Sequence, residues 1–396
     1  MLNFYKGETT LKSIPRIVSS LTSLMIFFLT LKLIGKESFA HLQSMYAVGG
    51  FILWVVDFGL LKSYSQKLGQ GDFQASREIF SLRIYIAYTV LIFPLLLGLL
   101  KILDFELSLL MLVAILDLFT ESFLDSRVLD KSNKQALLIQ LVKKLTLLIS
   151  IILMLAYRLD SLVILATVYG SFCTVLIIYE NLREGNNFKG IQIGRRIKDS
   201  LIFWRQSVAA SVSGLDTFIM NLIGTADLVV IYSGLKKIAN YIAIFGGTQS
   251  VLTLYYASRG IQLTELFTNI RRVSYHAFLM SIVTAFTVPL ILSMFLSVPR
   301  STSHIALSVI IIVLTPIGIL NSNINSILLG TQLTDNLVKT TLSISLCYLS
   351  LLLTLTRIDE SFGVAVSLIF SHFAQLIYFY GSYVKILQSE QNEIKK

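Results

Sequence analysis

The sequence becomes polar and basic near the middle of the chain, at residues 181–200, which read NLREGNNFKGIQIGRRIKDS. This stretch carries five basic side chains together with glycines, and it contains no apolar run long enough to cross a bilayer. On both sides of it lies a series of long apolar segments. We therefore predict that residues 181–200 are a cytosolic connector between two halves of a polytopic membrane protein, residues 1–180 and residues 201–396.

The composition agrees with a membrane protein. Of the 396 residues 55% are apolar and 14% are charged, and the mean hydropathy is +0.74, which is too much apolar surface for one water-soluble core. The net charge of +10 does not indicate a nucleic-acid partner, because the Lys and Arg residues are scattered over short loops. Both cysteines, Cys173 and Cys347, lie in apolar runs, so we expect neither a disulfide framework nor a metal site.

A helix that crosses the bilayer needs about 20 mostly apolar residues. In the first half such runs cover residues 14–34, 40–61, 80–100, 107–125, 136–157 and 161–180. In the second half they cover residues 201–223, 227–254, 273–296, 305–329, 337–356 and 361–384. The sequence thus predicts an all-α polytopic membrane protein with about 12 transmembrane helices in two six-helix bundles.

The basic residues predict how these helices are oriented. If both termini are cytosolic, and residues within three positions of a span end are counted with the adjoining loop, 22 of the 33 Lys and Arg residues, Arg83 among them, fall on the cytosolic side and five fall deeper inside spans. The remaining six fall outside, at Lys32, Lys36, Lys101, Arg158, Arg300 and Arg357. Positive charges accumulate on the cytosolic side of membrane proteins, so this bias favours cytosolic N and C termini.

Each predicted half has an even number of spans, so the two halves would share one orientation and be related by an axis along the membrane normal. A short repeat agrees with this relation. Leu33–Gly35 ends the first predicted span and Leu222–Gly224 ends the seventh with the same three residues, at an offset of 189.

Several segments carry a resemblance to a known family. Residues 33–60, LIGKESFAHLQSMYAVGGFILWVVDFGL, followed by KLGQGDFQASREIF at 67–80, resemble the start of the Wzx-type O-antigen and polysaccharide flippases of the MATE-like multidrug/oligosaccharidyl-lipid/polysaccharide (MOP) superfamily. The matching features are a Gly after span one, an Asp-Phe-Gly at the inner end of span two, and a Gly-Asp in the first inner loop. Residues 222–242, LIGTADLVVIYSGLKKIANYI, and 328–336, LLGTQLTDN, are similar to later hairpins of that family.

The resemblance implies a V-shaped pair of bundles around a central cavity in the bacterial cytoplasmic (inner) membrane. It implies transport by alternating access of an undecaprenyl-pyrophosphate-linked oligosaccharide, the repeat unit of O-antigen or a related surface polysaccharide. The expected partners are this lipid-linked substrate, membrane lipid, and the polysaccharide polymerase and chain-length regulator of the same pathway. No cofactor is expected apart from a coupling H+ or Na+, and no nucleic acid.

Two lysines lie at the predicted middle of the membrane, where a charge costs about 2.5–3.5 kcal/mol. Lys236 and Lys237 follow Gly224 by about 12 residues, which places them roughly 18 Å deep. Adjacent side chains point about 100° apart on a helix, so one acid cannot serve both, and we expect at least one lysine to reach a water-filled lumen and bind substrate. The alternatives are a Lys236–Asp216 ion pair with Lys237 snorkelling, or a helix broken near Gly234.

Three further cations are candidate substrate ligands. Lys143 and Lys144 in span five lie at the depth of Asp117 and Glu121 in span four, so two hypotheses stay open. One is a buried pair between one of these lysines and one of these acids, and the other is that the lysines face the lumen and bind an anionic substrate. Arg205 lies five residues into span seven and is either a substrate clamp or an interfacial arginine.

Acidic residues inside the spans are the candidates for binding a coupling ion, and these are Asp216, Glu121, Asp117 and Asp57. For Asp57 the alternative is that it serves as the turn residue of its Asp-Phe-Gly. The amides of Asn321, Asn323 and Asn325 in span ten alternate along the chain, so we expect them to form hydrogen bonds between helices.

The sequence shows no nucleophile elbow, metal quartet or phosphate-binding loop, so we expect a transporter rather than an enzyme. Two other classes remain open. A MATE-type drug or cation antiporter would favour an acidic, aromatic-lined cavity. A polysaccharide polymerase or ligase, which is an enzyme, would favour a long outer loop with arginines.

Overall fold

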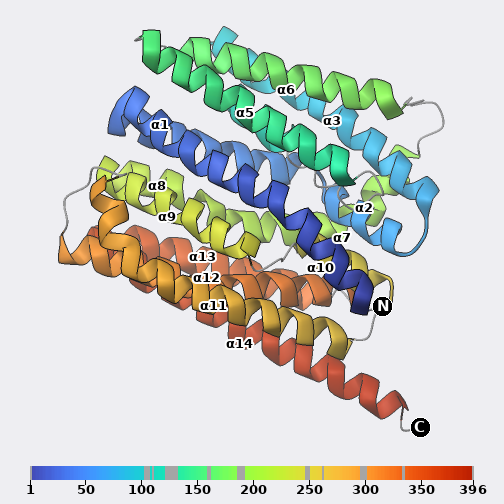
Figure 1. Ribbon diagram of the computed structural model, residues 1–396. Helices are drawn as coiled ribbons and strands as arrows, with labels where there is room; N and C mark the ends of the chain where they lie inside the picture. Colours follow the sequence, from blue (N-terminus) through green and yellow to red (C-terminus); the bar gives the residue numbers. More distant parts are fainter. Residues whose placement is uncertain are drawn as a thin grey trace.

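A computed structural model describes the backbone of residues 2–101, 108, 111–120, 133–157, 162–184, 192–245, 250–260, 263–294, 301–331 and 335–394. Within these ranges the ordered elements are all helical. Figure 1 shows most of them as long helices stacked side by side, with the two termini at the same end of the bundle.

The first half begins with α1 (Leu2–Val56), which is interrupted at Gly35. Gly35 has φ 75°, a left-handed conformation that glycine adopts without a steric penalty, and the chain turns back there (Figure 1). The predicted span 14–34 lies in the first arm of α1, and the predicted span 40–61 covers the second arm and runs on into α2. The elements that follow are α2 (Leu60–Gly69), α3 (Phe73–Leu99), a helical segment Met111–Thr120, α5 (Asn133–Tyr157) and α6 (Leu162–Glu184).

The second half begins with α7 (Ile193–Ser211), so the last residues of the predicted connector are already helical. A 3-10 turn, η1 (Val212–Leu215), separates α7 from α8 (Asp216–Ile223) and interrupts the predicted span 201–223. The remaining helices are α9 (Ala226–Phe245), α10 (Ser250–Ser258), α11 (Leu263–Met294), α12 (Thr302–Thr331), α13 (Asp335–Leu355) and α14 (Glu360–Ile394).

Among the described residues, six helical stretches are long and apolar enough to cross a membrane, so the chain is a multi-pass membrane protein. They are Leu21–Val56, Leu138–Tyr157, Leu263–Ile291, Thr302–Gly330, Asp335–Leu355 and Glu360–Gln388. The first contains both arms of α1, and two shorter apolar helices, Met111–Thr120 and Val168–Tyr179, fall within other predicted spans. The count of twelve spans in two six-helix bundles stays a prediction.

The packing of α1 joins the two halves. In its first arm Phe27 and Leu31, and in its second arm Phe39 and Ala40, are buried in an apolar cluster whose other members come from the second half. A separate cluster holds the end of α1, α2 and α3 together. Large apolar side chains such as Phe286, which is 81% exposed, lie on the outside, as expected of a surface that faces lipid rather than water.

Candidate functional site

A buried carboxylate with several donors lies where η1 gives way to α8. Asp216 is the first residue of α8, and its side chain is 5% exposed. The Lys236 ammonium lies 2.7 Å from Oδ2 and 2.9 Å from Oδ1. The Tyr232 hydroxyl donates to Oδ2, the Tyr348 hydroxyl donates to it at 3.2 Å, and the Thr217 hydroxyl donates to Oδ1 at 3.1 Å. Helices α8, α9 and α13 thus converge on one carboxylate.

The sequence spacing explains part of this arrangement. Tyr232 and Lys236 are four residues apart, so they lie on one face of α9 and can reach the same acid. The ammonium also lies 4.6 Å from the centroid of the Tyr232 ring, at cation–π distance. Of the alternatives for this lysine, the ion pair with Asp216 is the one that the structure shows.

The solvent exposure of α9 increases abruptly at Lys236. Residues 228–235 are buried, whereas the Lys236 side chain is 42% exposed and Lys237 and Asn240 are exposed. Lys237 lies about 17 Å along α9 from its start, near the middle of the helix. A lysine at this depth is strongly disfavoured in contact with hydrocarbon, so we interpret this face of α9 as facing water.

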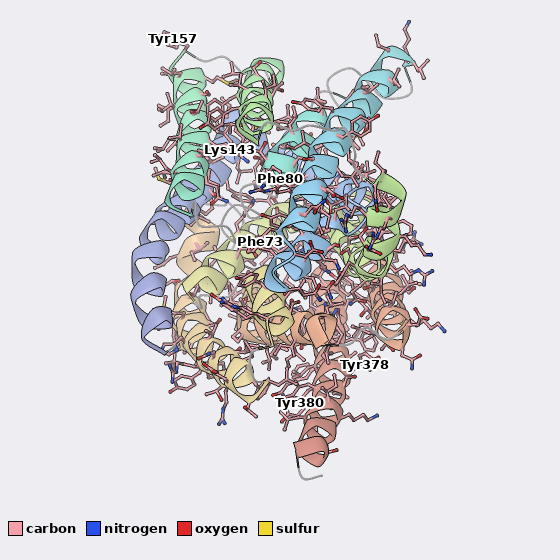
Figure 2. All side chains as sticks on the ribbon, turned by 90° about the vertical axis from the view of Figure 1, so that its right-hand side faces the viewer. Phe73, Phe80, Lys143, Tyr157, Tyr378 and Tyr380 are labelled. Atoms are coloured by element: carbon pink, nitrogen blue, oxygen red, sulfur yellow. The ribbon has the colours of Figure 1, made fainter. Side chains whose placement is uncertain are left out.

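A second cluster of similar chemistry lies in the first half. The Lys143 ammonium pairs with the Asp117 carboxylate and donates to the Asp117 carbonyl oxygen at 3.0 Å, and the Tyr169 hydroxyl donates to the same carboxylate. Lys143 is 1% exposed, and Figure 2 shows it on the side of α5 that faces the rest of the molecule. The predicted buried pair is therefore confirmed as Lys143 with Asp117. Lys144 is half-buried, and Glu121 lies outside the described residues.

Asp57 stabilises a turn and also forms an ion pair with a buried arginine. Its Oδ2 accepts the Leu61 N–H at 3.0 Å, which supports its prediction as a turn residue. Its Oδ1 lies 2.9 Å from Arg83 Nε, and the two side chains are 3% and 0% exposed. Sequence reasoning missed Arg83 because it counted this residue among the cytosolic cations, although its position inside the predicted span 80–100 was a usable signal.

Arg205 lies apart from these clusters. Its Nη1 is 3.6 Å from Asp335 Oδ1 at the start of α13, and the side chains are 58% and 68% exposed. Both hypotheses for Arg205, a substrate clamp and an interfacial arginine, stay predictions.

Polar side chains also connect the second-half helices. Gln206 donates from Nε2 to Asn325 Oδ1 at 3.1 Å and to Thr341 Oγ1 at 3.0 Å, which links α7, α12 and α13. Asn321 donates to the His372 carbonyl oxygen on α14 at 2.9 Å. The predicted role of these asparagines in bonds between helices is confirmed, whereas Gln206 was missed. Among the described residues no group of three or more His, Cys, Asp or Glu residues could hold a metal ion.

No family model and no curated protein matches the sequence. Solved structures do match across nearly the whole chain. An outward-facing multidrug-resistance MATE transporter of the MOP superfamily has TM-score 0.70 and 13% identity, covering 97% of this chain and 96% of that one. A MATE transporter of Vibrio cholerae has TM-score 0.66 and 14% identity, covering 96% of each chain. The lipid II flippase MurJ, in an inward closed conformation, has TM-score 0.66 and 15% identity, covering 94% of this chain and 87% of that one.

These identities are low, so the matches establish the fold alone. The chain has the fold that these MATE transporters, one of them described as a member of the MOP superfamily, share with the lipid II flippase MurJ. The expected resemblance is confirmed at this level.

Proposed function

We propose that the protein is a flippase that moves an undecaprenyl-pyrophosphate-linked oligosaccharide, an O-antigen or related surface-polysaccharide repeat unit, across the bacterial inner membrane. The observation that carries this proposal is the exposed cationic face of α9. Lys236 is 42% exposed although it is paired, and Lys237 beside it is exposed. Ammonium groups near the middle of a span suit a pyrophosphate headgroup, to which they donate charge-assisted hydrogen bonds.

The distribution of charge favours an anionic cargo. The three intramembrane acids described, Asp216, Asp117 and Asp57, have side chains that are 5%, 15% and 3% exposed, and each is paired with Lys or Arg. A cationic drug that approached α9 would meet ammonium groups rather than free carboxylates. An anion would be attracted to the same surface.

The transport cycle would be alternating access. The two halves would rock about the connector at residues 181–200, while the lipid tail stays in the bilayer. Lys237 would meet the headgroup first, Arg205 would leave its exposed pair with Asp335 to join it, and Lys236 would turn from Asp216 to the pyrophosphate. Asp216 would then be the acid that takes up a coupling H+ or Na+.

The other candidate residues receive secondary roles in this scheme. Lys143 with Asp117, and Arg83 with Asp57, are buried pairs that hold the first half together. Lys144 and Glu121 remain candidates for substrate and ion binding. We place both termini in the cytosol, and the polysaccharide polymerase and chain-length regulator of the pathway are the proposed partners.

Surface-polysaccharide export in cells tests this function. Replacing Lys236 and Lys237 together with Ala should abolish export while the protein level is maintained. Lys339→Ala, which removes an exposed lysine at the start of α13, is the matched control and should leave export unchanged. Normal export by the double variant would remove both lysines from the site.

A MATE-type drug or cation antiporter is the second candidate, because MATE transporters have the same fold. The tyrosines beside Asp216 would then line a cation site. Efflux of ethidium from cells distinguishes the two functions: efflux that depends on Asp216, without an effect on export, would favour the antiporter.

A further inference from the structure

We infer that the outward face of α11 is a binding site for an anionic phospholipid of the surrounding bilayer. Arg271 and Arg272 hold the phosphate of this lipid, and its acyl chains lie along the apolar residues that follow them in the helix. The site is separate from the cationic face of α9 and does not depend on the proposed cargo. Figure 1 shows α11 and α14 on the side of the bundle away from the first-half helices α3, α5 and α6.

The exposed apolar residues of α11 form one face of the helix. They recur every three or four positions, which is the spacing of one side of an α-helix. On the opposite side Ala277 and Val288 are buried in the core of the second half. The exposed residues extend over about 18 Å of helix, which matches an acyl chain in one leaflet of a hydrocarbon core about 30 Å thick. They are Phe278, Leu279, Ile282, Val283, Phe286 and Leu290.

Two arginines continue the same face toward the start of α11. Arg271 and Arg272 are exposed, and they precede Phe278 and Leu279 by seven residues, which is about two helical turns. The ion pairs found among the described residues include neither arginine. The nearest acid in α11, Glu265, lies about 9 Å away along the helix axis. This end of the face therefore presents two positive charges without a paired carboxylate.

Contacts with α14 fix the level of these arginines relative to the apolar surface. α14 passes the start of α11 in the opposite direction (Figure 1). The Tyr383 hydroxyl donates to the Leu263 carbonyl oxygen at 3.3 Å, and the Phe267 and Tyr383 rings stack with centroids 4.7 Å apart. Arg271 lies one turn beyond Phe267, at the level of Ile377 on α14. Ile377 is 75% exposed, so the arginines leave α11 where its neighbour still presents an apolar side chain to the bilayer.

The chemistry of this position favours a lipid phosphate. An arginine at the edge of the hydrocarbon extends its guanidinium into the headgroup layer while its aliphatic stem stays among apolar atoms. There the guanidinium binds phosphate oxygens through paired, charge-assisted hydrogen bonds. Tyr275, one turn deeper and 60% exposed, is a residue type enriched at the membrane interface. Two unpaired cations favour a headgroup with a net negative charge, because the ammonium of a zwitterionic headgroup is repelled.

Lipid binding to the purified protein tests this site. In native mass spectrometry of delipidated protein in detergent, the first phosphatidylglycerol should bind more tightly than phosphatidylethanolamine with the same acyl chains. Arg271→Gln/Arg272→Gln should weaken phosphatidylglycerol binding about 30-fold, because each cation near a membrane surface contributes about a factor of five. Arg195→Gln/Lys198→Gln removes the same charge from exposed positions of α7 and is the matched control. Equal binding of the two lipids by the parent protein, or an equal loss in both variants, would overturn the site.

A tryptophan in the face locates the bound lipid. In a Trp54→Phe/Trp204→Phe background, Tyr275→Trp is the sole tryptophan, and brominated acyl chains quench it on contact. In phosphatidylcholine vesicles with a small brominated fraction, brominated phosphatidylglycerol should quench it several-fold more than brominated phosphatidylethanolamine. Phe286→Trp, about 16 Å farther along the same face, is the control and should show no such preference. A preference that is equal at both positions, or that survives Arg271→Gln/Arg272→Gln, contradicts the inference.

The same measurements identify other occupants of the face. A second copy of the chain would appear as a dimer in the mass spectrum. If no brominated lipid quenches Tyr275→Trp, protein rather than lipid covers the face and the inference is wrong. The mass-spectrometric test needs no tryptophan replacement, so it holds even if the Trp204→Phe background fails to fold. Neither readout involves transport, so a failure of the proposed cargo leaves this inference unaffected, and the reverse is also true.

Discussion

The Lys236 ammonium lies 2.7 Å from Asp216 Oδ2, yet the lysine side chain is 42% exposed and the aspartate 5%. The pair therefore reaches from the protein interior to an accessible surface of α9. Water or a ligand can approach the cation, whereas the carboxylate is enclosed by hydroxyl donors from Tyr232, Tyr348 and Thr217.

This asymmetry predicts unequal effects of removing the two partners. Lys236→Met leaves a buried carboxylate with neutral donors only, and we expect it to lower the free energy of unfolding by about 2–3 kcal/mol. Asp216→Asn leaves an ammonium that water can solvate, and the expected loss is about 1 kcal/mol or less. Thermal unfolding in detergent measures both. Lys237→Met is the adjacent control and should be neutral; equal losses in the two partner variants would contradict the assignment.

The pair Arg83–Asp57 should be the more costly one to break. Arg83 is 0% exposed, so Arg83→Met leaves Asp57 charged, buried and without its cation, with an expected loss of about 3–5 kcal/mol. Arg77→Met, on the exposed face of the same helix, should change stability by about 0.5 kcal/mol or less. Adding Asp57→Asn to Arg83→Met should recover stability, because the amide oxygen can still accept the Leu61 N–H. If the double variant is no more stable than Arg83→Met, the stability lost in Arg83→Met comes from the packing of the Arg83 side chain and not from its charge.

The hydroxyl of Tyr169 should stabilise the first-half cluster. Tyr169→Phe removes a donor to the Asp117 carboxylate, and hydrogen bonds to charged groups contribute about 1.5–3 kcal/mol. Tyr179→Phe, on the same helix and 50% exposed, is the matched control and should be neutral. Urea-dependent unfolding of the two variants gives the comparison. If both lose the same stability, the hydroxyl of Tyr169 has no specific role.

The ion pair between the halves at the end opposite α2 should contribute little to stability. Lys36 Nζ lies 2.7 Å from Asp227 Oδ1, with side chains 35% and 33% exposed. We expect Asp227→Asn to lower stability by about 0.2–1 kcal/mol at low salt. The loss should fall further at high ionic strength, because salt screens exposed charges. A large loss that persists in high salt would mean that this pair is shielded from solvent in the membrane.

Counting residues along the helices predicted a buried ion pair in the first half, but it did not identify which two residues form the pair. Depth alone could not choose between Lys143 and Lys144, or between Asp117 and Glu121, because the rotation of each helix about its axis decides which side chain faces inward. The same uncertainty hid the bonds of Gln206, whose partners lie 119 or more residues away along the chain. The contact of Gly59 with Trp204 had no sequence signal beyond the Asp-Phe-Gly turn.

The sequence by itself determined that this is a helical membrane protein with several long apolar helices, because apolar length is a property of local segments. Only the tertiary structure decided that Lys236, rather than Lys237, is bound to Asp216, and that α2 contacts both halves. Those outcomes depend on how helices far apart in the chain rotate and pack against one another, which is set by side-chain fit between them rather than by any one segment.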